Sequence, residues 1–402
     1  MDLDVTAVRS AFPALKTGVA HFDGPGGSQV PAEVAQAVAD TLCGGLANRG
    51  SVTAAERRAE DVVVAARQAM ADLLGCSAQG VAFGRSMTQL TYDVSRALAK
   101  QWGPGDEVVV TRLDHDANVR PWVQAAEAVQ ATVRWAAFDA DSAELPVSAV
   151  TEVLSDRTRV VAVTGASNLL GTRPDVAALA EAAHAAGALV YVDGVHLAPH
   201  APVDVVALGA DFFACSPYKF FGPHLGVLVA DPALLETVHP SKLLPSSDAV
   251  PERFEFGTLP YELLAGTTAA VDFIAGLAPV EADRRDRRAQ VLASMEAVEA
   301  SEDRLFARLL AGLGELDGVA LIGQPARRTP TALFTVAGST PSHVYEHLAS
   351  RGVNAPAGSF YAIEAARWLG LGELGAVRAG LAPYTDDEDV DRLVAGVAEL
   401  CP

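Results

Sequence analysis

Two sequence patterns alternate between residues 60 and 230 and limit the folds open to this 402-residue chain. Short apolar runs rich in β-branched residues are followed by alanine-rich stretches of helical character. Such alternation predicts a parallel sheet wrapped by helices. The expected strands cover residues 107–111, 132–138, 159–164, 189–192, 212–215 and 226–230, and the expected helices cover residues 54–74, 88–102, 118–129 and 175–186.

The last third of the chain has a different pattern. A long charged helix is expected over residues 281–313, with the charge run 281–288 on a solvated face, and three strands and two shorter helices follow it. These strands cover 319–322, 332–336 and 377–381, and these helices cover 341–351 and 386–400. Because the chain is longer than one core usually supports, we expect more than one domain. The predicted parts are an N-terminal segment 1–20 that packs with the small domain, a large domain 21–265 and a small α+β domain 266–402.

Charge and composition exclude several classes of partner. The chain has 30 Lys and Arg against 50 Asp and Glu, and its net charge of −20 repels nucleic acid and anionic membranes. It contains no apolar run of about 18 residues and its N-terminus lacks the pattern of a signal peptide. We therefore expect a cytoplasmic protein with no nucleic acid and no membrane partner. The 4 cysteines are scattered, and prolines interrupt the His196 and His200 spacing, so no metal site is expected.

Two charged residues close two of the expected apolar strands. Asp193 directly follows the strand 189–192, and Lys219 follows the strand 212–215 among aromatic residues that would exclude water. A desolvated lysine loses its proton more easily and becomes a nucleophile. Pyridoxal 5′-phosphate requires one amine to form a Schiff base and one carboxylate beside its ring nitrogen. The pair predicts such a site, although Lys219 taken alone could also extend from a strand end into solvent.

Further polar residues lie where a parallel sheet binds its ligands, at the carboxyl ends of the strands. Ser86, Met87 and Thr88 open a helix after a short strand, so their amides and hydroxyls are placed to bind a phosphate. A simple helix cap at Thr88 is the alternative for this segment. Ser216 provides a second hydroxyl, and His115 is placed to stack on a pyridine ring or to be an ordinary loop residue.

Seven short motifs follow one another in order over nearly the whole chain. They are Phe22-Asp-Gly-Pro-Gly-Gly, Asp114-His-Asp-Ala-Asn, Ser167-Asn-Leu-Leu-Gly-Thr, Val192-Asp-Gly-Val-His, Ser216-Pro-Tyr-Lys, Phe256-Gly-Thr and Val377-Arg-Ala-Gly-Leu-Ala-Pro-Tyr. This series resembles the class V aminotransferase family of fold-type I pyridoxal phosphate enzymes, in its cysteine desulfurase and selenocysteine lyase branch. The resemblance implies an α/β fold with a mainly parallel seven-stranded sheet flanked by helices and a smaller α+β C-terminal domain.

The resemblance also implies roles for residues around the cofactor ring. Lys219 would form the Schiff base, Asp193 would pair with the ring nitrogen and His115 would stack on the ring. Asn168, and His196 where relatives usually have glutamine, would lie near the phenolic oxygen.

Three further roles concern the phosphate, the substrate and a second subunit. Thr88 and Ser216, with the Ser86 and Met87 segment, would hold the phosphate. Thr258 would reach the same phosphate from the partner subunit, so a homodimer with shared active sites is expected. Arg378 would bind the carboxylate of an amino acid substrate through its two-pronged guanidinium.

One stretch departs from the desulfurase pattern. Desulfurases of this branch carry a nucleophilic cysteine on a loop of the small domain, whereas residues 352–361 contain none. Pro356 stands where an arginine is expected, and Tyr361 falls about where the thiol is expected. The sequence therefore predicts a C–S β-lyase without a persulfide cysteine. A class V aminotransferase or an epimerase acting on a small amino acid is the alternative, and a cofactor-binding protein without turnover is less favoured.

Overall fold

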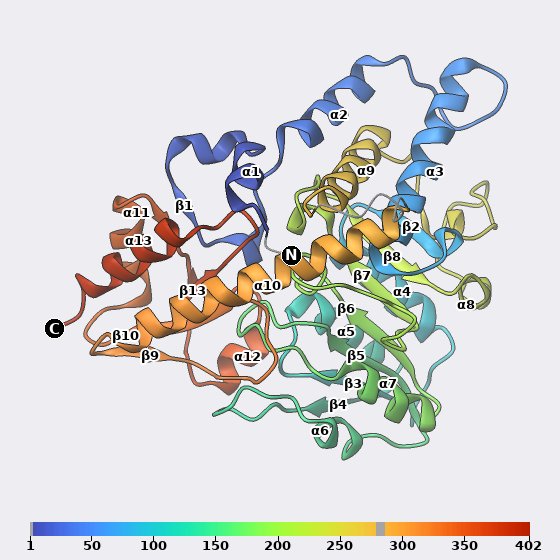
Figure 1. The fold of residues 1–402 in the computed structure, drawn as a ribbon. Coiled ribbons are helices and arrows are strands. Elements are labelled where there is room, and N and C mark those ends of the chain that lie inside the picture. Colours follow the sequence, from blue (N-terminus) through green and yellow to red (C-terminus); the bar gives the residue numbers. More distant parts are fainter. Residues whose placement is uncertain (1–2, 279–285) are drawn as a thin grey trace.

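The computed structural model describes residues 3–278 and 286–402, and Figure 1 shows their fold. Residues 281–285 of the expected charged helix and charge run lie outside this part of the chain. None of the described helices is both long enough and apolar enough to cross a membrane.

A seven-stranded sheet forms the centre of the larger part of the molecule. Its spatial order is β2-β8-β7-β6-β5-β3-β4. Five neighbouring strands are parallel to one another: β7, β6, β5, β3 and β4. The strand β8 pairs antiparallel with both β7 and β2. The bounds are β2 (Val81–Gly84), β3 (Glu107–Thr111), β4 (Thr132–Ala136), β5 (Thr158–Thr164), β6 (Leu189–Asp193), β7 (Phe212–Cys215) and β8 (Gly226–Ala230).

Both faces of this sheet are covered by helices, because side chains that alternate along each strand enter two different cores. Val161 and Val163 of β5 pack in one core, whereas Val160 and Ala162 pack in the other. The first core includes α3 (Ala54–Leu74), α7 (Val176–Ala185) and α9 (Tyr261–Ala275), and the second includes α4 (Met87–Ala99) and α5 (Arg120–Ala128). The predicted fold class is confirmed, and the predicted strands match those observed to within two residues at each end.

A smaller antiparallel sheet has the order β12-β13-β10-β9. Its strands are β9 (Val319–Leu321), β10 (Thr331–Val336), β12 (Ala357–Gly358) and β13 (Ala376–Gly380). It packs with α10 (Arg287–Gly314), α11 (Pro341–Ser350) and α13 (Asp387–Ala398) in a separate core. In Figure 1 the helix α10 runs from this sheet to the helices beside the large sheet.

The N-terminal residues contact the part of the chain that carries the small sheet. Arg9 of α1 (Val5–Ser10) pairs with Asp386 and Asp389, and β1 (Ala20–His21) pairs with β11 (Val353–Asn354). The expected domain boundary after residue 265 lies within α9, which packs on α3 and on α2 (Ala32–Cys43). The boundaries of the three parts stay a prediction. The remaining helices are α6 (Val147–Thr151), α8 (Pro232–Thr237) and α12 (Ile363–Trp368).

Candidate active site

A cavity of about 540 Å³ lies at the carboxyl ends of the parallel strands. Nine of the eleven predicted site residues line it: Met87, Thr88, His115, Asn168, Asp193, His196, Ser216, Lys219 and Arg378. The strand ends bring eight of them together from the large sheet, and β13 of the small sheet contributes Arg378. The expected convergence on one sheet edge is therefore seen, while the role of each residue stays a prediction.

Ser86 and Thr258 do not line this cavity. Ser86 is the N-cap of α4, where its hydroxyl accepts a hydrogen bond from the Gln89 amide at 3.1 Å. The cap is thus Ser86 and not Thr88, which lines the cavity from the first turn of the helix. Thr258 is exposed on the segment before α9.

Lys219 lies on a short turn after β7, and its amine contacts Pro25, which also lines the cavity. Its Nζ donates to the Pro25 carbonyl at 2.6 Å and lies 4.8 Å from the centre of the Tyr218 ring. Burial lowers the pKa of Lys219 to about 7, the positive charge of Arg378 acts in the same direction, and Asp193 opposes both. A substantial fraction of this amine is therefore neutral at neutral pH.

Asp193 is the last residue of β6 and is almost completely buried. Its Oδ1 accepts a hydrogen bond from the Val195 amide at 3.0 Å. Burial raises the pKa of Asp193 to about 6, while that hydrogen bond and the charge of Lys219 limit the rise. The carboxylate therefore carries most of its charge at neutral pH and can pair with a protonated ring nitrogen.

His115 follows β3 and presents a neutral ring. Its Nδ1 accepts a hydrogen bond from the Ala117 amide at 3.0 Å, so the proton of the neutral ring is on Nε2. Burial lowers the pKa of His115 to about 4, and Lys219 lowers it further. The Tyr361 ring lies 5.7 Å away at an interplanar angle of 29°.

Arg378 brings a buried positive charge to the cavity from the small sheet. Its Nη1 donates to the Asn168 carbonyl at 2.9 Å, and its guanidinium lies 3.8 Å from the centre of the Phe360 ring. Its Nε is buried without a hydrogen-bond partner among the described residues. Burial lowers the pKa of Arg378 to about 9, so the group is still charged at neutral pH.

Asn168 and His196 occupy the wall next to Arg378. The Asn168 Nδ2 donates to the Phe360 carbonyl at 2.9 Å, while its Oδ1 is buried with no partner in the described part of the chain. The Nε2 of His196 lies 3.0 Å from the hydroxyls of both Thr329 and Thr331. Burial holds the pKa of His196 well below its usual value, so this ring is neutral.

The start of α4 forms the end of the cavity suited to an anion. The amides of Met87 and Thr88 are the first two of the helix and have no acceptor within it. Gly226 of β8 permits this placement, because a Cβ there would lie 2.2 Å from the Ser86 carbonyl carbon. The buried Ser216 hydroxyl lines the same cavity, so a phosphate would find amides, hydroxyls and a helix N-terminus together.

Sequence reasoning missed several residues of the cavity wall. Tyr92, Asp116, Arg120 and Phe360 all line it. Arg120 donates to Glu364, which lies 244 positions later in the chain. A contact between residues so far apart has no local sequence signal, which is why Arg120 was not predicted.

The comparisons with known proteins agree with this geometry. The model of the family described as "Aminotransferase class-V" matches residues 20–393. The chain belongs to the class V aminotransferase family. Members of this family are enzymes that depend on pyridoxal 5′-phosphate, so the predicted family, enzyme class and cofactor are confirmed.

Individual relatives place the chain near the cysteine desulfurases of this family. It is 34% identical over 402 residues to the uncharacterized protein MT3887 of Mycobacterium tuberculosis, covering 100% of both chains. It is 30% identical to a cysteine desulfurase of Dickeya dadantii, covering 98% of this chain and 96% of that protein. The crystal structure of the Escherichia coli cysteine desulfurase CsdA matches with a TM-score of 0.87 and 27% identity, covering 100% of both chains.

Proposed function

We propose that this protein is a C–S β-lyase that cleaves cysteine conjugates without forming a persulfide on the enzyme. The observation that carries the proposal is a cavity whose wall, among the described residues, has a low-pKa lysine and a buried arginine but no cysteine. The net reaction is R–S–CH₂–CH(NH₃⁺)–COO⁻ + H₂O → R–SH + CH₃–CO–COO⁻ + NH₄⁺. Its products would be a thiol, pyruvate and ammonium.

The residues of the cavity fit pyridoxal 5′-phosphate. Lys219 supplies the amine, Asp193 the buried carboxylate, and the start of α4 with Ser216 the anion site. When bound, the cofactor supplies an electron sink for the electron pair left at the substrate Cα. His115 presents a neutral flat ring, and Asn168 retains a buried carbonyl oxygen without a partner in the described chain.

Lys219 is suited to move the proton at Cα. A base works best when its pKa is near the operating pH, because it is then neutral often enough to accept a proton and acidic enough to return it. A pKa of about 7 meets this requirement.

Arg378 is suited to orient the substrate by its carboxylate. Only Nη1 of its guanidinium is bound to protein in the described chain, and the buried Nε is unpaired. A carboxylate that accepted from Nε and Nη2 would satisfy this edge with two parallel hydrogen bonds. Such a contact would hold the Cα of an amino acid at one place in the cavity.

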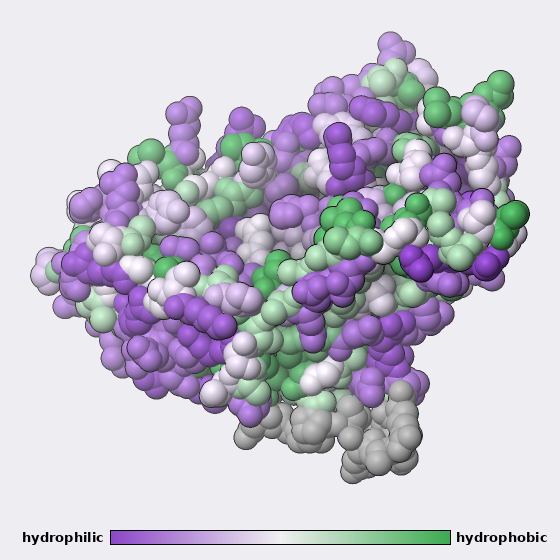
Figure 2. Space-filling view, turned by 90° about the horizontal axis from the view of Figure 1, so that it is seen from above, coloured by the Kyte–Doolittle hydropathy of each residue, from purple (hydrophilic) through white to green (hydrophobic). Residues whose placement is uncertain are grey.

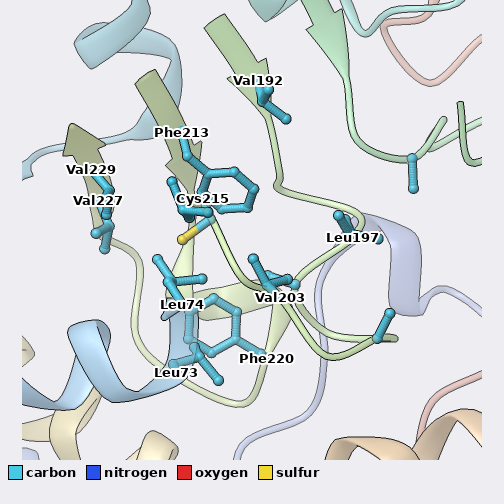
Figure 3. Close-up of a cluster of buried hydrophobic side chains, with 14 of the residues drawn as sticks. Leu73, Leu74, Val192, Leu197, Val203, Phe213, Cys215, Phe220, Val227 and Val229 are labelled. Carbon is cyan, nitrogen blue, oxygen red and sulfur yellow. The ribbon is translucent and has the colours of Figure 1, made fainter. Parts of the chain in front are cut away.

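The four cysteines support release of the sulfur as a free thiol. None of them lines the cavity: Cys43 is exposed, Cys76 and Cys401 are partly buried, and Cys215 is buried. Figure 3 shows Cys215 in the hydrophobic core with Phe213, Leu74 and Phe220. Burial raises the pKa of Cys76 to about 12 and also raises that of Cys215, so neither is a ready thiolate.

The test is incubation of the holoenzyme with cysteine, several S-substituted cysteines and other amino acids. We expect equimolar pyruvate and thiol from cysteine conjugates, and no product with Lys219→Ala. Lys219→Ala is compared with Lys16→Ala, which removes an exposed lysine. Formation of a keto acid that retains its sulfur would instead identify transamination, and inversion at Cα would identify epimerisation. Either result without pyruvate contradicts the proposal.

We also propose that the enzyme acts as a homodimer in the cytoplasm. Large hydrophobic side chains are exposed on the two segments that carry Arg49 and Thr258: Val52 is 82% exposed, Leu244 is 98% exposed and Phe256 is also exposed. Figure 2 shows hydrophobic residues among hydrophilic ones on one face of the molecule. Arg49 links these segments by pairing with Glu252. Sedimentation equilibrium should give twice the chain mass of 41.7 kDa, and a monomer that is fully active would contradict the dimer.

A further inference from the structure

Two consecutive aromatic residues, Phe360 and Tyr361, cover one side of the cavity and are called the aromatic roof below. Both have left-handed backbones, with φ of 52° and 58°. Residues with a Cβ rarely adopt this conformation, and two in succession require support from their surroundings. The roof is therefore placed by contacts with the rest of the molecule.

Two of those contacts come from the large-sheet side of the cavity and one comes from Arg378 of β13. The Asp116 amide donates to the Tyr361 carbonyl at 2.7 Å, and the Asn168 Nδ2 donates to the Phe360 carbonyl at 2.9 Å. The Arg378 guanidinium packs on the Phe360 ring. Both backbone carbonyls and the Phe360 ring are therefore held in place by contacts within the protein.

Tyr361 is the most exposed of the tyrosines that line the cavity. It is 77% exposed, whereas Tyr92 and Tyr218 are partly buried. The Tyr92 ring is covered by Arg96 at 4.9 Å, and the Tyr218 ring is stacked on His224 at 4.7 Å. The His115 ring lies beside the Tyr361 ring at 5.7 Å, and the exposure of Tyr361 leaves further aromatic surface that a bound molecule can cover.

The charged residues next to the roof compensate one another. Arg120 pairs with Asp116 at 2.8 Å and with Glu364 at 2.5 Å, and Arg112 lies 3.6 Å from Glu364. Arg367, which is largely exposed, lies 3.5 Å from Glu364 as well, so both acids are paired with arginines and Arg112 and Arg120 each already have an acidic partner. A charged substituent placed between these paired groups would lose hydration without gaining a free counterion, whereas an uncharged one has no such hydration to lose.

We propose that Tyr361 is a specificity-determining residue that selects cysteine conjugates with a flat, uncharged aryl or heteroaryl group on the sulfur. The proposal rests on the lyase function proposed above. With the carboxylate at Arg378 and Cα near Lys219, the group on sulfur extends to the part of the wall that carries Tyr361. The ring stacks on this group and buries it, and elimination then releases it as an aryl thiol together with pyruvate and ammonium.

The first test measures binding without chemistry. 3-(Phenylthio)propionate, 3-(methylthio)propionate and 3-(carboxymethylthio)propionate lack the amine and cannot react, so their dissociation constants are measured by calorimetry on the holoenzyme. We expect the phenylthio acid to bind at least about 10-fold more tightly than the other two. Tyr361→Ala should reduce this preference to about 2-fold or less, whereas Tyr361→Phe should retain it. Tyr345→Ala, at a partly exposed tyrosine of α11 outside the cavity, is the matched control.

The second test compares kcat/KM for S-phenylcysteine and S-methylcysteine in the same variants. Tyr361→Leu, which keeps apolar bulk without a ring, replaces Tyr361→Ala if that variant fails to fold. Loss of the Tyr361 ring could lower kcat/KM equally for both substrates, so that the ratio of the two values does not change. That result overturns the proposal for Tyr361, although pyruvate is still formed. If the protein still prefers the phenylthio acid through Tyr361 but forms no pyruvate from any conjugate, the lyase function is overturned instead.

Discussion

The two walls of the cavity are built in different ways. On the large-sheet wall, Asp193 ends β6 and His115 follows β3, and each is oriented by an amide two positions further along the chain. On the small-sheet wall, Phe360 and Arg378 are held by Asn168, at separations of 192 and 210 positions. The side chains proposed to carry out the reaction are thus positioned by local structure. The side chains proposed to select the substrate are positioned by packing between segments far apart in the chain.

This comparison predicts that changes on the large-sheet wall affect the rate of reaction more than the binding of substrate. Asp193→Ala should lower kcat by about 10²–10³-fold, because a charge that stabilises the electron sink is lost. Cofactor retention, measured by absorbance, should change far less than kcat. A variant with unchanged kcat would show that Asp193 does not serve the ring nitrogen.

A change on the small-sheet wall should show the opposite pattern. Arg378→Gln should raise KM by about 10- to 100-fold, because it removes charge-assisted hydrogen bonds to the substrate carboxylate. Steady-state kinetics with one cysteine conjugate and with its methyl ester would check this. The ester lacks the carboxylate charge, so its KM should change little. Equal losses for acid and ester would mean that Arg378 acts through the fold.

The pH dependence of cofactor capture should report mainly on Lys219. With its pKa near 7, the neutral and reactive amine falls as the pH drops through 7. The second-order rate of reconstitution of the apoenzyme should therefore rise about 10-fold from pH 6 to pH 8 and then level off. Stopped-flow absorbance measures it. A rate that continues to rise to pH 10 would mean that Lys219 keeps the pKa of an exposed lysine.

The smallest expected effect concerns the strained backbone of the roof. Tyr361→Gly should raise the free energy of unfolding by about 0.5–1 kcal/mol, because glycine adopts a positive φ without steric cost and the side chain lost is 77% exposed. Tyr345→Gly, within α11, should lower it by a similar amount. Denaturant melts of the apoproteins measure both, and the same sign for both variants would argue against strain at Tyr361.

Much of the site could be predicted because its chemistry follows strand ends. Lys219, Asp193, Asn168 and Ser216 each come shortly after an apolar run, and parallel strands bring their carboxyl ends to one edge. Ser86 shows where this reasoning was incomplete. Its hydroxyl caps α4 by accepting a hydrogen bond from the Gln89 amide, and the sequence motif alone does not show this bond.

The sequence by itself determined the alternating layers, the strands that carry chemistry, the family and the cofactor. Apolar runs and helical patterns, with short motifs at the strand ends, are local properties that do not depend on how distant segments pack. Only the tertiary structure decided that Phe360 and Tyr361 cover the cavity, that Arg120 is neutralised by Glu364 and that burial brings the pKa of Lys219 to about 7. These features depend on contacts and desolvation between residues far apart in the chain, and no short stretch of sequence contains them.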